Sequence, residues 1–114
     1  MGVVYYANYL VWFEVGRADL MRTLGRTYRQ LEEEGIILPV IEARCEYRQP
    51  ARYDEEIEIR TTGAILSPVR MKFLYEIVRR GDGASLASGH TIHAAVDAGG
   101  RLRRLPADLR KAFE

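Results

Sequence analysis

The sequence predicts a single α+β domain spanning residues 1–114, in which one long helix is followed by antiparallel strands. Hydrophobic residues first follow a helical spacing and then, from about residue 40, alternate with polar residues at the period of two that is typical of strands. The strands do not alternate with helices, as a parallel sheet would require. The 114 residues are 47% hydrophobic, which is enough for one modest core.

The first predicted element is a long helix from about Tyr6 to Leu24. This segment contains no proline and one glycine, Gly16. Its apolar residues lie on nearly every side, which is typical of a buried helix. Because Gly16 and Ala18 carry little or no side chain, the backbone there can approach a sheet closely. One curved sheet covers only one side of such a helix, so we expect a second copy to cover the other, in at least a homodimer.

The remaining elements follow from the period of two and from the turn residues. In the first strand we expect Ile41, Ala43, Cys45 and Tyr47 to face the core. Gly81, Asp82 and Gly83 indicate a hairpin turn, and Pro106 opens a short terminal helix. The predicted segments are a helical turn at Thr27–Gly35, strands at Val40–Tyr47, Glu56–Thr62, Arg70–Val78 and Leu86–Val96, and a helix ending at Phe113.

Composition excludes several classes of function. Seventeen basic and sixteen acidic residues leave a formal net charge of +1, so no overall charge favours nucleic acid or an anionic membrane as a partner. The single cysteine, Cys45, cannot form an intrachain disulfide and fits a reducing compartment. The apolar start lacks the basic region of a signal peptide, and no segment approaches the ~20 apolar residues of a membrane span. We therefore expect a soluble, cytoplasmic protein.

Three segments carry a resemblance to a known family. The segment GVVYYANYLVWFEVGR, from Gly2 to Arg17, resembles the signature of the 4-hydroxybenzoyl-CoA thioesterases and the YbgC-type acyl-CoA thioesterases. The segment YRQPARYDEEIEI, from Tyr47, is similar to that family's Pro-Ala turn and the acidic start of its next strand. The ending VDAGGRLRRLP, from Val96 to Pro106, resembles its last hairpin. The matches follow the family's order along nearly the whole chain.

The resemblance implies a hotdog fold, in which a curved antiparallel sheet wraps a long central helix. It implies a homodimer, often a homotetramer, with active sites at the dimer interface. The implied reaction is hydrolysis of a small or medium acyl-CoA, or of an acyl group on acyl carrier protein, to a free acid and a thiol. No cofactor is expected, since coenzyme A is part of the substrate.

The sequence departs from the family at its start. The family's catalytic aspartate lies three residues before the glycine that matches Gly2, so its counterpart would precede Met1. The family's first strand has no counterpart in the chain either. We favour a trimmed start as the explanation. The alternative is a non-catalytic module that binds acyl-CoA or acyl carrier protein and has lost this carboxylate.

Thioester hydrolysis needs hydrogen-bond donors for the developing oxyanion and a carboxylate that acts as nucleophile or general base. A helix that begins near Tyr6 offers free N–H groups and the positive end of its dipole. By the resemblance, the backbone N–H of Tyr6 is the candidate donor, within a catalytic segment that includes Val4 and Tyr5. Aromatic packing at the helix entry is the alternative for the two tyrosines.

Further candidates lie along the helix and in the sheet. Gly2 and Asn8 are predicted to contact the substrate, although Asn8 is also suited to capping the helix. Glu14 lies about two turns after Tyr6 and offers a carboxylate within the chain, unless it pairs with Arg17. After a turn, Ser67, Arg70 and Lys72 are candidates for binding the coenzyme A phosphates, with a solvated strand face as the alternative.

No metal site is predicted. His90 and His93 are three residues apart on a strand, so their side chains point to opposite faces and are expected to be structural. Cys45 has no neighbouring motif for nucleophilic or zinc chemistry and is expected in the core. A hotdog dehydratase would need a histidine where this sequence has Tyr6, which favours the hydrolase.

Overall fold

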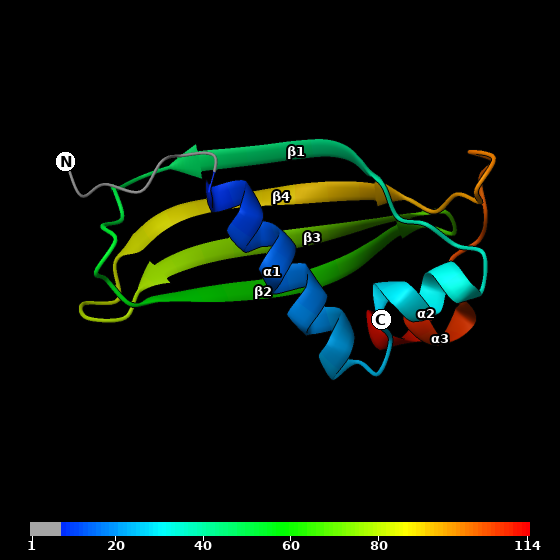
Figure 1. The fold of residues 1–114 in the computed structure, drawn as a ribbon, viewed down its shortest axis with the longest axis horizontal. Helices are drawn as coiled ribbons and strands as arrows, with labels where there is room; N and C mark the ends of the chain where they lie inside the picture. The colour runs from blue at the N-terminus through cyan, green and yellow to red at the C-terminus, as the bar shows by residue number, and fades with distance from the viewer. Residues whose placement is uncertain (1–7) are drawn as a thin grey trace.

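A computed structural model describes residues 8–114 of the chain. It contains four strands in one antiparallel sheet, in the order β1-β4-β3-β2, and α1 runs diagonally across one face of this sheet (Figure 1). The predicted α+β class and the order of its elements are confirmed. The elements are α1 (Asn8–Thr23), α2 (Tyr28–Glu33), β1 (Val40–Tyr47), β2 (Ile57–Ser67), β3 (Arg70–Arg79), β4 (Ser85–Ala94) and α3 (Ala107–Ala112).

The buried face of α1 packs mainly on β2 and β3. Phe13 is fully buried and stacks on Tyr75, with ring centroids 4.2 Å apart. At Gly16 the helix backbone lies directly on β2, where an added Cβ would be 2.8 Å from Ile59 Cγ2 and would also collide with Thr61 Oγ1. This confirms that Gly16 permits a close approach to the sheet.

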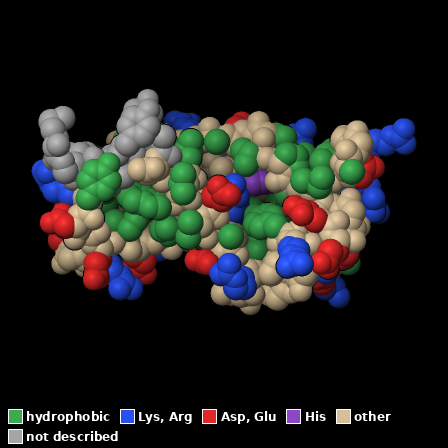
Figure 2. Space-filling model, viewed as in Figure 1, with side chains coloured by type: hydrophobic (Ala, Val, Ile, Leu, Met, Phe, Trp, Pro, Cys, Tyr) green, Lys and Arg blue, Asp and Glu red, His purple; other side chains and the backbone are tan. Residues whose placement is uncertain are grey.

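The outer face of α1 is exposed in the single chain. Leu10, Val11 and Val15 have exposed fractions of 44%, 53% and 45%. Apolar side chains gather on this helix-bearing face of the molecule (Figure 2). As predicted, the sheet covers only one side of this helix. The second copy expected on the other side stays a prediction.

Strand β1 is also more exposed than predicted. Of its eight residues only Cys45 is half-buried, and the other seven are exposed. The reason is that α1 crosses the other strands and leaves β1 at the edge of the sheet (Figure 1). A bulge between Val40 and Glu42 also shifts Ile41 out of the predicted alternation. Cys45 packs against the rim of the core and is not enclosed by it, and burial raises the pKa of its thiol.

The end of β2 differs most from the predicted bounds. Strand β2 continues to Ser67, beyond the predicted end at Thr62, because β2 and β3 pair along their whole length up to a tight turn at Pro68 and Val69. Helix α2 begins at a capping box, in which Thr27 and Gln30 bond to each other's backbone N–H groups. No helix in residues 8–114 is long and apolar enough to cross a membrane.

Candidate active site

Tyr9 anchors the start of α1 to the loop that follows β1. Its side chain is 3% exposed, and its hydroxyl accepts a hydrogen bond from the backbone N–H of Ala51 at 3.1 Å. Its ring meets Trp12 and Tyr47 edge to face, with centroids 4.9 and 5.0 Å away. These contacts hold residues 48–56 against the helix start.

Arg79 holds the same loop from the other side. Its Nε donates to Glu55 Oε2 at 3.2 Å, and its two terminal nitrogens donate to Asp82 Oδ2 at 3.0 Å and to the carbonyl of Pro50 at 3.4 Å. Desolvation raises the pKa of Glu55, but bonds from the Arg52 N–H and from Arg79 outweigh it, so the net shift is downward. Glu55 is therefore an ionised carboxylate near the helix start.

The loop and the first turns of α1 enclose a cavity of about 230 Å³. A helix leaves its first N–H groups without intrahelical partners, and its dipole is positive at this end. The cavity can therefore stabilise a negative charge that develops beside the helix start, while Trp12 and Ile57 provide an apolar wall. Its lining is Asn8, Val11, Trp12, Arg52, Tyr53, Glu55 and Ile57.

The structure places the predicted helix-entry residues as follows. Gly2, Val4, Tyr5 and Tyr6 lie outside the described residues, so the proposed oxyanion donor stays a prediction. Asn8 is the first residue of α1 and lines the cavity.

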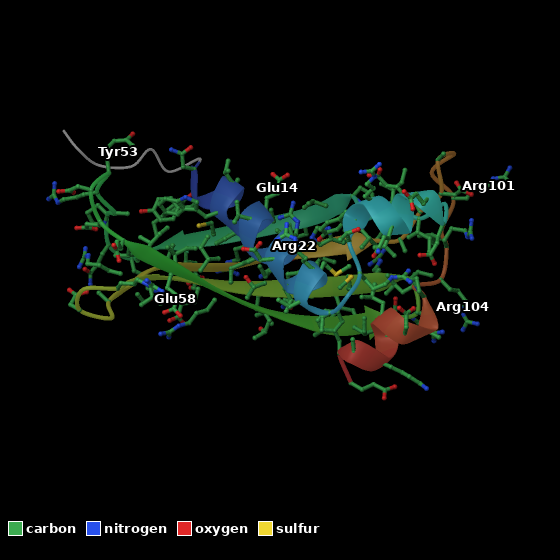
Figure 3. The ribbon with its side chains drawn as sticks, turned by 60° about the horizontal axis from the view of Figure 1, so that its bottom comes forward. Glu14, Arg22, Tyr53, Glu58, Arg101 and Arg104 are labelled. Atoms are coloured by element: carbon green, nitrogen blue, oxygen red, sulfur yellow. The ribbon has the colours of Figure 1, made fainter. Side chains whose placement is uncertain are left out.

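Glu14 does not share this cavity. It is exposed, and Figure 3 shows its side chain projecting outward from α1. Glu14 and Arg17 both line another hollow beside α1. They do not form the predicted ion pair with each other in the described residues 8–114.

The predicted phosphate-binding residues lie at the other end of the sheet. Arg70 and Lys72 alternate along β3 with the fully buried Met71 and Phe73. Arg70 and Lys72 therefore share the outer face of the strand. Ser67 Oγ accepts a hydrogen bond from the Val69 N–H, which stabilises the turn before β3. A single chain does not bring these residues to the start of α1 (Figure 1), and their role stays a prediction. Arg101 and Arg104 also lie at the end opposite Tyr53 (Figure 3).

The two histidines face opposite sides of the sheet, as predicted. His93 is 1% exposed, and its ring nitrogens bond to the Leu38 carbonyl and to Thr91 Oγ1 at 2.9 and 2.8 Å. Burial, with a smaller contribution from the charge of Arg17, lowers the pKa of His93. His90 lies on the outer face, 2.6 Å from a carboxylate oxygen of Glu42. Within residues 8–114 no three metal-binding side chains form a cluster.

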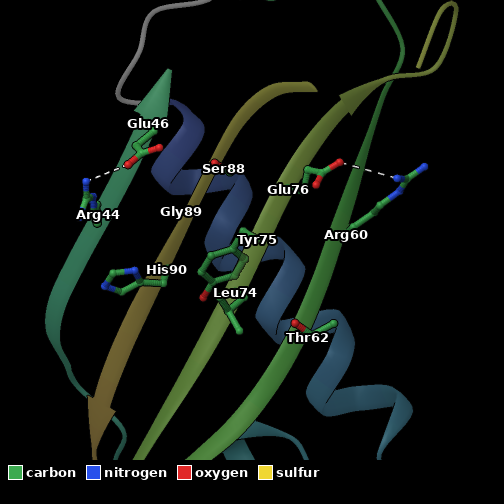
Figure 4. A pocket seen from close by; sticks show the side chains of 10 residues that line it. All are labelled: Arg44, Glu46, Arg60, Thr62, Leu74, Tyr75, Glu76, Ser88, Gly89 and His90. Atoms are coloured by element: carbon green, nitrogen blue, oxygen red, sulfur yellow. Dashed lines mark hydrogen bonds and ion pairs between the residues drawn. The ribbon is translucent and has the colours of Figure 1, made fainter. Parts of the chain in front are cut away.

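A wider depression of about 490 Å³ covers the outer face of the sheet around His90 (Figure 4). Its charged side chains pair with one another, since Arg44 lies 2.8 Å from Glu46 and Arg60 lies 3.7 Å from Glu76. It faces away from α1, so it has no access to the helix start. We therefore place the candidate active site at the smaller cavity.

Sequence reasoning missed the loop residues of this site. The segment from Arg52 to Glu55 follows the predicted Pro-Ala turn, and Arg79 lies just beyond the predicted end of a strand at Val78. The acidic run before β2 was visible in the sequence, but no local pattern connects Glu55 with an arginine 24 residues later. Only the hairpin of β2 and β3 brings them together.

The family profile of the thioesterase-like superfamily matches residues 1–113 of the chain. The chain belongs to this superfamily. One relative is the "Putative acyl-CoA thioesterase YneP" of Bacillus subtilis strain 168. It is 34% identical to this chain, and the match covers 99% of this chain and 79% of the relative. The resemblance found in the sequence is thereby confirmed.

Two solved structures of the superfamily show the same hotdog fold. A hypothetical protein, TT1821 from Thermus thermophilus, is 37% identical, with a TM-score of 0.88 over 99% of this chain and 85% of that one. The DHNA-CoA thioesterase from Staphylococcus aureus is 33% identical, with a TM-score of 0.85 over 92% of this chain and 70% of that one. The sheet and its diagonal helix are therefore the framework that this chain shares with both structures.

Proposed function

We propose that this superfamily member is an acyl-CoA thioesterase that hydrolyses small or medium acyl-CoA thioesters to the free acid and coenzyme A. The observation that carries the proposal is the cavity at the start of α1, where an apolar wall meets the positive end of a helix. The activities named for the relatives from Bacillus subtilis and Staphylococcus aureus support the same reaction.

The cavity fits the chemistry of this reaction. As water attacks the thioester carbon, negative charge grows on the carbonyl oxygen, and donors aimed at that oxygen stabilise it. The carbon–sulfur bond then breaks, and the thiol leaves with little acid assistance, since thiols have a pKa of about 8.5. Trp12 and Ile57 would contact the acyl group, and Tyr53 lies at the entrance, where it is 68% exposed.

Two carboxylates are candidates for the base that activates water. One is an aspartate upstream of Met1, as in the family pattern. The other is Glu14, which would act across an interface, because it points away from the cavity of its own chain (Figure 3). The exposed apolar residues of α1 and β1 support a homodimer, or a tetramer built from it, in which Arg70 and Lys72 of a second copy are candidates for binding the coenzyme A phosphates. The single cysteine supports a cytoplasmic location.

Release of thiol from acetyl-, hexanoyl-, palmitoyl- and benzoyl-CoA tests the proposal, with a thiol-reactive dye as the readout. The assay compares this chain with a version extended upstream, and each with its Glu14→Gln variant. We expect hydrolysis of at least one substrate by the extended form. Loss of activity in Glu14→Gln would identify Glu14 as the base, and retention would favour the upstream aspartate.

One observation favours the alternative of a binding module. Among the described residues, the carboxylate that lines the cavity is Glu55, and it is already engaged by Arg79 and by the Arg52 N–H. A site without a free base would bind acyl-CoA, or acyl carrier protein, without cleaving it. Absence of thiol release from every substrate in both forms, together with acyl-CoA binding in a calorimetric titration, would establish this alternative.

A further inference from the structure

Glu55 lines the candidate active site with one carboxylate oxygen bound and the other unused. The backbone N–H of Arg52 and the Nε of Arg79 both donate to Oε2, each at 3.2 Å. Within residues 8–114, no hydrogen bond reaches Oε1. The side chain is only 22% exposed, so these two bonds hold it in one position. Glu55 is thus a fixed carboxylate with an unused acceptor.

The unused oxygen is available on the side of the cavity at the helix start. Arg79 does not line this cavity but a separate hollow, which Glu55 also borders. Because Oε2 accepts the hydrogen bond from Arg79, it faces that hollow, and Oε1 is left for the cavity. The lowered pKa of Glu55 makes it a poor base and keeps Oε1 negatively charged. The residue is therefore suited to binding a donor and not to activating water.

The place of Glu55 in the loop indicates which part of an acyl thioester it meets. Trp12 and Ile57 form the apolar wall of the cavity, and the exposed Tyr53 lies at its entrance. Glu55 lies between Tyr53 and Ile57 in the chain, so the part of the substrate that extends to the entrance passes it. In a thioester of coenzyme A or of acyl carrier protein this part is pantetheine, whose first amide N–H lies two carbon atoms from the sulfur.

We propose that Oε1 of Glu55 binds the pantetheine amide N–H nearest the thioester sulfur, and that Arg79 positions Glu55 for this contact. A charged acceptor makes a stronger hydrogen bond than a neutral one. The contact orients the thioester with its carbonyl oxygen towards the start of α1. The proposal rests on the proposed function for the identity of the substrate, and it adds the group that recognises the pantetheine arm.

Two truncated substrates that differ in one group test this contact. S-hexanoyl-N-acetylcysteamine carries the amide N–H, and S-hexanoyl-O-acetyl-2-mercaptoethanol has an ester oxygen in its place. Neither carries the phosphates of coenzyme A, so the negative charge of Glu55 does not repel them. In the form of the protein that releases thiol, we expect kcat/KM to be about tenfold or more higher for the amide, because the ester lacks the charge-assisted hydrogen bond.

Variants connect this preference with Glu55. Glu55→Met keeps an unbranched side chain of similar length but removes the acceptor, so it should abolish the preference for the amide. Arg79→Gln should reduce the preference less, since Glu55 remains but is no longer held. Glu56→Gln is the matched control, because the Glu56 side chain is 82% exposed and does not line the cavity. It should leave the preference unchanged. A circular dichroism spectrum establishes that each variant is folded.

A purely structural role of Glu55 predicts a different result. Glu55→Met would then lower kcat/KM for both substrates equally, and an unchanged ratio overturns the proposal. Equal kcat/KM values for the amide and the ester in the wild-type protein overturn it without any variant, and an unchanged ratio in Arg79→Gln overturns the positioning role. If no form releases thiol, the proposed hydrolysis fails. The dissociation constants of the two matching S-hexyl thioethers, measured by NMR titration, then test the contact by the same ratio.

Discussion

Tyr9 connects the stability of the fold with the shape of the candidate active site. Replacing it with phenylalanine keeps the edge-to-face packing but removes the acceptor for the buried Ala51 N–H. A buried N–H without a partner costs about 1–3 kcal/mol. We expect Tyr9→Phe to lower the free energy of unfolding by this amount and to raise KM for acyl-CoA, because the loop over the helix start is loosened.

Urea unfolding and steady-state kinetics measure these two effects. Tyr53→Phe is the control for stability, because the Tyr53 side chain is 68% exposed and such changes usually alter stability by less than about 0.5 kcal/mol. An unchanged unfolding free energy in Tyr9→Phe would mean that water replaces the lost acceptor.

His93 gives the fold a dependence on pH. Burial lowers its pKa below the usual value, so between the folded and the unfolded pKa the unfolded chain binds more protons. The contribution of His93 to the free energy of unfolding is complete above its pKa in the unfolded chain, which is about 6.5. This contribution is lost as the pH falls below that pKa. We expect the free energy of unfolding to fall as the pH is lowered from about 6.5 towards about 5.

Urea unfolding at each pH, with wild type and His93→Gln, measures this contribution. The variant lacks the titrating ring, so its unfolding free energy should change less over the same range, even if it is less stable throughout. Parallel pH profiles for the two proteins would assign the dependence to other groups.

At the scale of elements, the contact between α1 and β2 depends on Gly16. Alanine is normally the better helix former, by about 1 kcal/mol. Here its Cβ would meet Ile59 Cγ2 at 2.8 Å and collide with Thr61, so the helix would have to move off the sheet. Overpacking of this kind typically costs about 1–3 kcal/mol. We expect Gly16→Ala to destabilise the protein in thermal and urea unfolding.

Gly81→Ala is the matched control for this prediction. An added Cβ at Gly81, in the hairpin turn, meets no atom within 4 Å. It should leave the unfolding midpoint nearly unchanged. Equal stability of Gly16→Ala and wild type would show that α1 shifts on β2 at no cost.

The elements themselves could be predicted because their signals are local. The alternation in β3 and the proline before α3 gave both elements close to their observed bounds. The end of β2 could not be found, because pairing with β3 extends it through Gly63 and Ala64, which carry no strand pattern of their own. The approach of Arg17 to Tyr28 could not be predicted either, since the two residues lie on different helices.

At the scale of the whole molecule, one side of the helix–sheet pair is left uncovered. The sequence suggested an all-apolar helix, and the structure divides that surface into a face packed on the sheet and a face that is open (Figure 2). The open face includes Leu10 on α1, and the exposed edge strand β1 includes Ile41. Large exposed apolar surfaces and open strand edges are typical of protein–protein interfaces.

We therefore expect the protein to sediment as a dimer or tetramer, and Leu10→Glu to shift it towards the mass of a single chain. The buried glutamate in such an interface would lose hydration without a partner, whereas in the monomer it would remain exposed. Leu102→Glu is the control, because Leu102 is 62% exposed at the other end of the molecule. If the wild-type protein sediments as a single chain at tens of micromolar, the uncovered face is not an interface between copies. The base for hydrolysis would then have to come from within one chain, which would exclude the outward-facing Glu14.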